Sequence, residues 1–107
     1  MLLSKIWNQP AEGYVSFYCP ACDLPHTVPI TLGVPNAWTW NGDSNKPTLR
    51  PSLLSRVTAY EHKNSLFKDG DKIICHCWVT DGKIEYLGDS THAYALQTID
   101  IPDYPYI

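Results

Sequence analysis

The sequence predicts a mainly β, all-β fold, a small antiparallel sheet or sandwich with a zinc knuckle, and three observations predict it. Nine prolines in 107 residues leave few windows for a helix, because proline lacks an N–H donor and clashes with the preceding helical turn. No segment sustains apolar residues at helical spacing. The motif Cys19-Pro20-Ala21-Cys22 has the spacing of half a structural zinc site. We therefore expect short strands held together partly by a metal ion.

Length, charge and composition limit the kinds of protein that this chain can be. The length fits one zinc-binding β domain spanning residues 1–107. The net charge is −3 and the basic residues are scattered, so there is no basic stripe for nucleic acid. No apolar run is long enough to cross a membrane, and the start lacks the pattern of a signal peptide. We expect a cytoplasmic protein with reduced cysteines and no nucleic-acid or membrane partner.

Short β-like runs recur along the chain and justify the predicted sheet. Pro29 places the second run at a sheet edge or a bulge. The stretch 41–51 is polar and bounded by prolines, which indicates an ordered loop, and the charged stretch 62–71 indicates a second loop. The predicted strands are 14–18, 27–32, 37–40, 53–60, 73–80, 83–87 and 95–99.

The strongest local prediction is a hairpin around Asp81-Gly82. This dipeptide favours a two-residue type I′ turn between two β-rich runs. The turn would pair Thr80 with Lys83 and, further along, Cys77 with Tyr86. Side chains alternate between the two faces of a sheet. The face that holds Cys75 and Cys77 is apolar and should point to the core, whereas His76 should point to the opposite side.

The cysteines and one histidine form the predicted metal site. Two thiolates separated by two residues can bind one tetrahedral ion, and a second Cys/His group must complete the site. Cys77 or His92 could replace the histidine ligand, and buried free thiols or a redox pair are the alternatives to a metal. We predict a zinc ion (Zn²⁺) bound by Cys19, Cys22, His26 and Cys75.

A second polar group follows the predicted hairpin. Asp89 can accept the imidazole N–H of a histidine and orient it if the chain folds back. This predicts a polar site of His76, Asp89 and His92, which would be catalytic if the protein is an enzyme. The alternative is that Asp89-Ser90-Thr91 caps a turn against which His92 packs.

Five motifs occur in a fixed order along most of the chain. They are Cys19-Pro20-x-Cys22-x-x-x-His26, Trp38-x-Trp40-Asn41-Gly42-Asp43, Pro47-Thr48-Leu49-x-Pro51-Ser52-Leu53, Cys75-His76, and Asp81-Gly82-x-Ile84-x-Tyr86-Leu87-x-Asp89-x-Thr91-His92-Ala93. Together they resemble a family of short phage and prophage zinc-binding proteins of unknown function, whose relatives are associated with bacterial ubiquitin-like conjugation systems. The resemblance implies a shared fold and a suspected metal-dependent peptidase role. It favours Cys19, Cys22, His26, Cys75, His76 and His92 as the chemically interesting positions.

These features predict a non-enzymatic function first. Four protein ligands leave zinc no open position for catalysis, so we expect a phage-type accessory protein that binds a host or phage protein. The alternative is a zinc-dependent hydrolase acting on a peptide or isopeptide bond. In that case Cys75 or His76 would hold the ion with His92, and Asp89 or Glu85 would orient a ligand or act as general base.

Overall fold

Seven β-strands and no helix are found in residues 1–58 and 72–106, which are the residues that the computed structural model describes. The prediction of an all-β protein is therefore confirmed. In the described part of the chain no helix has the length and apolarity needed to cross a membrane. The strands are β1 (Tyr14–Cys19), β2 (Leu24–Pro29), β3 (Thr39–Trp40), β4 (Leu49–Thr58), β5 (Lys72–Thr80), β6 (Lys83–Tyr86) and β7 (Thr98–Asp100).

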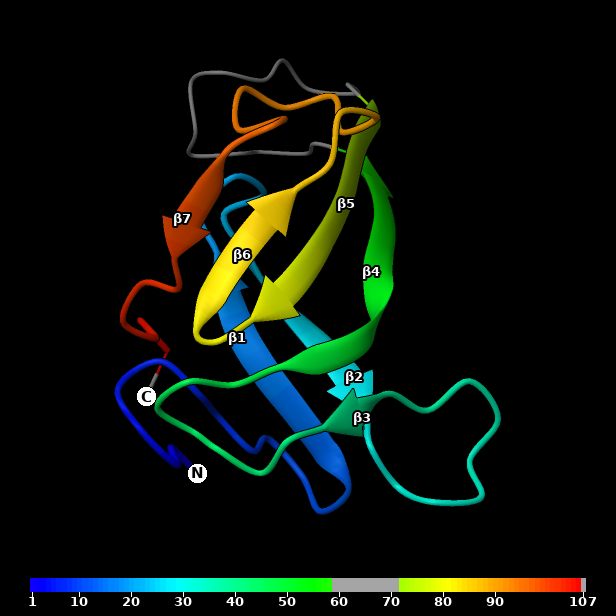
Figure 1. Cartoon of the computed structure of the whole chain (residues 1–107), viewed down its shortest axis with the longest axis vertical. Helices are drawn as coiled ribbons and strands as arrows, with labels where there is room; N and C mark the ends of the chain where they lie inside the picture. Colours follow the sequence, from blue (N-terminus) through cyan, green and yellow to red (C-terminus); the bar gives the residue numbers. More distant parts are fainter. Residues whose placement is uncertain (59–71, 107) are drawn as a thin grey trace.

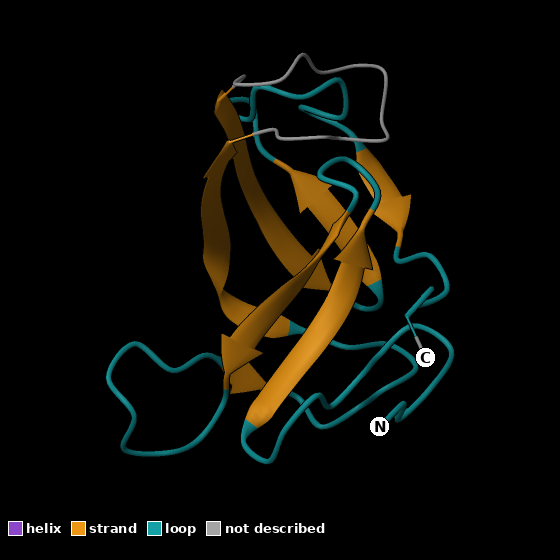
Figure 2. Cartoon of the chain, turned by 180° about the vertical axis from the view of Figure 1, so that it is seen from behind, coloured by secondary structure: helices purple, strands orange, loops and turns teal. Residues whose placement is uncertain are grey.

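The strands form two antiparallel sheets, drawn in Figures 1 and 2. The smaller sheet is the β1–β2 hairpin, and the larger has the strand order β3-β4-β5-β6-β7. Each strand of the larger sheet pairs with the next one along the chain. This is an antiparallel meander, so short connections suffice to join its strands.

The Asp81-Gly82 hairpin forms in the predicted register. Thr80 pairs with Lys83, and Cys77 pairs with Tyr86. Both turn residues have positive φ, 49° for Asp81 and 76° for Gly82, as a type I′ turn requires. The alternation along β5 also follows the prediction, because Cys75 and Cys77 are buried and their neighbour His76 is only half-buried.

Three strands begin three or more residues away from their predicted starts. β2 begins at Leu24 and ends at Pro29, which lies in an edge strand as expected. β4 begins at Leu49, so the last three residues of the predicted loop 41–51 belong to this strand. Proline is tolerated there because a bulge interrupts the ladder. β7 begins at Thr98, after a turn in which Leu96 has a φ of 68°. The predicted loop 62–71 lies outside the described residues.

The hydrophobic core lies between the two sheets. Trp7 is fully buried there, and its ring stacks on Phe17 of β1 with ring centroids 5.9 Å apart. The larger sheet contributes buried side chains from three of its strands. They are Leu49 and Leu53 of β4, Ile73, Cys75, Cys77 and Val79 of β5, and Ile84 and Tyr86 of β6. The opposite face of the larger sheet carries both polar and apolar side chains, among them His76, Glu85 and Leu54.

Candidate active site and metal centre

A bulge in β4 sets the position of Ser52. Leu49 pairs with Val79 and Leu53 pairs with Cys77, so three residues of β4 lie opposite the single residue Trp78 of β5. A bulge of this kind bends the strand and re-aims its side chains. Ser52 is the last of these three residues and lies beside the outer face of β5.

The hydroxyl of Ser52 is hydrogen-bonded to the ring of His76, with 3.0 Å between Ser52 Oγ and His76 Nε2. The other ring nitrogen, His76 Nδ1, lies 2.9 Å and 3.1 Å from the two carboxylate oxygens of Asp89. The three side chains therefore form a chain from hydroxyl to imidazole to carboxylate. With Nδ1 protonated, the ring donates to Asp89 and accepts from Ser52, which is how a base and its orienting group activate a nucleophile.

The segment after β6 holds Asp89 against His76. Leu87 donates its backbone N–H to the carbonyl of His76, and Thr91 donates its N–H to the carbonyl of Ile74. Between them, Ser90 accepts from the His76 N–H at 3.0 Å and donates to the His76 carbonyl at 3.1 Å. The segment thus continues the pairing of β6 along β5, and Ser90 N–H also donates to Leu87 in a turn. Asp89 is fixed opposite the imidazole by backbone contacts on both sides.

The triad of side chains is open to solvent to different degrees. The side chain of His76 is 25% exposed and that of Asp89 is 60% exposed, whereas Ser52 is half-buried. A ligand can therefore reach Ser52 from the outer face of the sheet. The exposed carboxylate interacts with the ring more weakly than a buried one would, because water screens it.

On the opposite face of the larger sheet, three cysteines and one histidine are placed to bind a metal ion. Their ligand atoms all lie within 4.8 Å of one another, and the four residues are buried. Cys19 Sγ and Cys75 Sγ are 4.0 Å apart. Tetrahedral zinc with Zn–S bonds of about 2.3 Å would place two sulfurs about 3.8 Å apart. The four residues are Cys19, Cys22, His26 and Cys75.

The ring of His26 fits a metal ligand. Its Nδ1 is hydrogen-bonded to Ser55 Oγ at 3.3 Å, whereas its buried Nε2 has no hydrogen-bond partner among the described residues. A buried polar atom without a partner is costly. A metal ion at Nε2 would remove that cost, and the contact with Ser55 would orient the ring as outer contacts of metal ligands do.

Electrostatic interactions single out Cys19 as the thiolate of the group. Hydrogen bonds from the thiols of Cys22 and Cys75 lower the pKa of Cys19 well below its usual range. The hydroxyl of Tyr86 lies 3.1 Å from Cys19 Sγ and can donate to it. The hydrogen bond between the Cys75 and Cys19 side chains raises the pKa of the Cys75 thiol. Thiolates next to a cation are stabilised, so a cation among these close sulfurs would lower the pKa of each ligand.

The remaining predicted residues belong to neither group, although Cys77 and His92 lie next to the metal ligands. His92 is buried and its ring packs edge-on against Tyr86, with centroids 4.8 Å apart. Burial lowers the pKa of His92. Since Tyr86 faces the core, His92 is not brought to His76 and Asp89 on the outer face. Cys77 is buried but is not among the four clustered ligands. Glu85 is exposed on β6 opposite Trp78.

No role for Ser52 is predicted from the sequence. The residue lies within Pro51-Ser52-Leu53, one of the motifs of the family resemblance, but no glycine-framed nucleophile motif surrounds it. Ser52 and His76 are 24 residues apart in the sequence, so their contact cannot be inferred from local spacing. The chain order serine, histidine, aspartate does not by itself identify a catalytic triad. A triad is recognised by its geometry rather than by sequence spacing.

Comparison with known proteins gives one match. A family model described as "Bacterial ubiquitination-like system serine protease (BubE)" matches residues 3–87. The match includes Ser52 and His76, and Asp89 lies two residues beyond it. No curated protein and no solved structure matches the chain.

The match agrees with the expected link to bacterial ubiquitin-like systems and corrects the predicted function. A non-enzymatic binding module conflicts with a family described as a protease, and a zinc hydrolase conflicts with a serine protease. The physical reason is visible in the fold. The clustered ligands lie on the core face, where four protein ligands leave a metal no open position, and the exposed histidine contacts a serine hydroxyl instead.

Proposed function

Because the chain belongs to the BubE family of serine proteases from bacterial ubiquitination-like systems, we propose that it is a serine protease that uses Ser52, His76 and Asp89. The observation that carries the proposal is the hydrogen-bonded chain across the larger sheet, from Ser52 Oγ through both nitrogens of His76 to Asp89. Nucleophile, base and orienting carboxylate are the three roles that acyl transfer by a serine requires.

The geometry supports an acyl-enzyme mechanism. Ser52 Oγ forms a bond to the carbonyl carbon of the scissile amide while its proton passes to His76 Nε2. His76 then gives that proton to the leaving nitrogen, and the C–N bond breaks. Water attacks the resulting ester, gives a proton to His76, and the Oγ–C bond breaks as the proton returns to Ser52. Asp89 accepts the Nδ1–H throughout and stabilises the imidazolium.

The bulge in β4 supports the remaining requirement, donors for the carbonyl oxygen that becomes negative. Extra residues in a bulge leave the regular ladder and keep unpaired backbone groups. Pro51 has no N–H, so the main-chain N–H of Ser52 itself is the donor that we expect nearest the reacting carbon.

We propose that the metal is zinc and that it has a structural role. Three thiolates and one imidazole form a donor set typical of structural zinc sites. Bound zinc would stabilise the packing of the β1–β2 hairpin on β5 by joining their side chains. The assignment of Cys19, Cys22, His26 and Cys75 predicts about one equivalent of zinc by elemental analysis of protein purified without added metal. Less than a tenth of an equivalent would contradict it.

The substrate that we propose is a protein of the ubiquitination-like system, encountered in the cytoplasm of a bacterium or of a phage-infected host. The family description supports protein substrates. The predicted phage origin remains a proposal that rests on the motifs of the sequence alone.

Covalent labelling tests the proposed function without knowledge of the substrate. An alkyl fluorophosphonate reacts with an activated serine, because Oγ bonds to phosphorus, fluoride leaves and the proton passes to the histidine. We expect labelling at Ser52, located by peptide mass spectrometry, and its loss in Ser52→Ala and in His76→Ala. Thr98→Ala, at an exposed position of β7 outside the triad, is the folded control and should still be labelled. Labelling of another serine, or labelling that survives in His76→Ala, would contradict the proposal.

A further inference from the structure

Near Ser52, two strand edges pair with no further strand in the described part of the chain. In the larger sheet β3 pairs only with Leu49 and Arg50, so no other described strand pairs with the outer edge of β4 beyond the bulge. In the smaller sheet β2 pairs only with β1, and its other edge faces β4. An unpaired strand edge presents a row of backbone donors and acceptors that an extended peptide can pair with.

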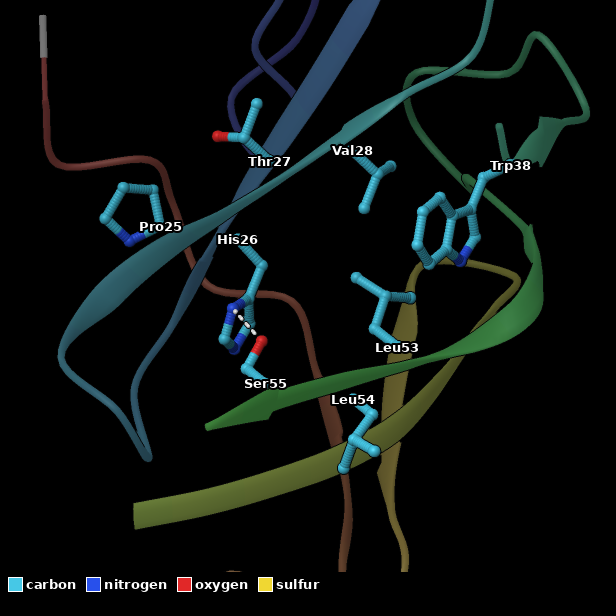
Figure 3. A pocket seen from close by; sticks show the side chains of 8 residues that line it. All are labelled: Pro25, His26, Thr27, Val28, Trp38, Leu53, Leu54 and Ser55. Atoms are coloured by element: carbon cyan, nitrogen blue, oxygen red, sulfur yellow. Dashed lines mark hydrogen bonds between the residues drawn. The ribbon is translucent and has the colours of Figure 1, made fainter. Parts of the chain in front are cut away.

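A groove of about 300 Å³ lies between these two edges. Figure 3 shows its two ends: His26 and Ser55 approach one another at one end, and Val28, Trp38 and Leu53 gather at the other. We call this hollow the β2–β4 groove. It is lined by Pro25, His26, Thr27, Val28, Trp38, Leu53, Leu54 and Ser55.

The apolar end of the β2–β4 groove adjoins the proposed nucleophile. Leu53 follows Ser52 directly, and Leu54 is two residues beyond Ser52 on the same face of β4, where it pairs with His76. Leu54 is 48% exposed. An exposed apolar side chain at the rim of a groove beside the triad provides a hydrophobic surface for a ligand.

The direction of the triad decides which part of a substrate the groove would take. His76 lies on the β5 side of Ser52 and must protonate the leaving nitrogen, so the leaving half of the substrate belongs on that side. The β2–β4 groove lies on the other side of β4. It is therefore placed to receive the acyl half, the residues that precede the scissile bond.

We propose that the β2–β4 groove is the acyl-side substrate site of the protease, and that it selects an extended peptide segment with apolar side chains before the scissile bond. The inference rests on the proposed function and deepens it. Backbone groups of the segment pair with the free edge of β4, as in other complexes formed by strand addition. Its side chains contact Leu54 and Trp38. The contact between His26 and Ser55 closes the far end, so the segment is short.

A second hollow on the far side of Trp78 offers a contrast. It is lined by Arg50, Trp78, Thr80 and Glu85. The guanidinium of Arg50 already lies over the Trp78 ring at 5.1 Å and donates to Thr80 and to the Val79 carbonyl. Since Arg50 and Glu85 place charged groups in its lining, this hollow suits an apolar segment poorly. Glu85 therefore provides a control position on the same face of the sheet as the triad.

The test compares rates of covalent inactivation by three probes. They are an alkyl fluorophosphonate, which needs only the activated serine, and the diphenyl phosphonates of acetyl-trileucine and acetyl-triglycine, which add acyl-side residues. Each phosphonate bonds to Ser52 Oγ with loss of phenoxide. Burial of a leucine side chain predicts a rate constant roughly tenfold or more higher for the trileucine probe than for the triglycine probe. Equal rate constants for the two peptides would overturn the inference.

Variants of the groove locate the preference. We expect Leu54→Glu to lower the trileucine rate constant by roughly tenfold or more and to leave the fluorophosphonate rate constant unchanged. The matched control Glu85→Gln should alter neither. A preference that survives Leu54→Glu but is lost in Glu85→Gln would overturn the assignment of the groove. Absence of fluorophosphonate labelling in the unsubstituted protein would instead overturn the proposed function, and with it this inference.

Discussion

At the scale of single residues, the two sites differ in how their side chains are held. The metal ligands are buried and fixed by packing, whereas Asp89 is 60% exposed and is positioned mainly by the backbone bonds of its neighbours. Solvent screens an exposed carboxylate, so its electrostatic effect on the imidazolium is reduced while its hydrogen bond to Nδ1 persists. In the proposed mechanism, Asp89 therefore acts chiefly by selecting the tautomer and orientation of His76.

This view of Asp89 predicts a graded effect of substitution. Asp89→Asn keeps the shape but can present an N–H to Nδ1, which would favour the wrong tautomer. We expect the rate constant of Ser52 labelling to fall by roughly 10²-fold to 10³-fold, less than the roughly 10⁴-fold loss seen for a buried aspartate in serine proteases. Rates measured with the fluorophosphonate probe check this. Asp81→Asn, at an exposed turn, is the matched control, and an unchanged rate for Asp89→Asn would remove Asp89 from the mechanism.

The residue scale also shows what the sequence could reveal about the site. The spacing of Cys19 and Cys22 is local, and it predicted a metal knuckle from chemistry alone. Alternation along β5 predicted that His76 points away from the cysteines. Ser52 could not be found in this way, because its contact with His76 crosses two strands and depends on a bulge that has no sequence signature.

At the scale of the elements, β5 joins the two sites. Cys75 points to the metal ligands and the adjacent His76 points to Ser52 and Asp89. The register of β5 is set by the tight turn at Asp81-Gly82, which follows from local sequence and was predicted correctly. The pairing of β4 with β5 was not predictable in the same way, because it joins segments on either side of residues 59–71.

The turn also supplies a test of how firmly the register is held. Gly82 has a φ of 76°, and a Cβ there would lie 3.2 Å from the carbonyl oxygen of Asn45. We expect Gly82→Ala to lower the free energy of unfolding by about 2 kcal/mol, from backbone strain plus the close contact. Gly33→Ala is the control, since its φ of 88° adds strain but its Cβ would meet nothing within 4 Å. It should cost about 1 kcal/mol. Chemical denaturation measures both, and equal losses would show that the contact with Asn45 relaxes freely.

At the scale of the whole molecule, the metal site joins sheets that are otherwise held by a thin core. The hairpin of β1 and β2 supplies Cys19, Cys22 and His26, and the larger sheet supplies Cys75. No described strand of one sheet pairs with a strand of the other. The two sheets also form the two walls of the β2–β4 groove. The same contact between sheets should therefore govern stability and access to the acyl-side groove.

Removal of the metal is consequently expected to affect both. Structural zinc in small peptides contributes an apparent binding free energy of about 10–16 kcal/mol, and small domains have a net stability of about 5–15 kcal/mol. A stripped chain should thus be largely unfolded, or should unfold at a much lower denaturant concentration. We expect chelation to lower the denaturation midpoint and to abolish labelling of Ser52, and added zinc to restore both.

In the proposed serine mechanism the metal affects labelling only indirectly, through the fold. Measuring Ser52 labelling and protein stability together separates a structural metal from a catalytic one. If the metal is structural, labelling falls in proportion to the fraction of unfolded protein, as followed by circular dichroism at each chelator concentration. Cys75→Ser should behave like the chelated protein, whereas Cys77→Ser, at a buried cysteine outside the cluster, should retain zinc and labelling. If chelation abolished labelling while the protein kept its full stability, the ion would act on the reaction itself. A structural role would then be wrong. A metal enclosed by four protein ligands on the core face has no position open to substrate, so a structural metal can affect labelling only through unfolding.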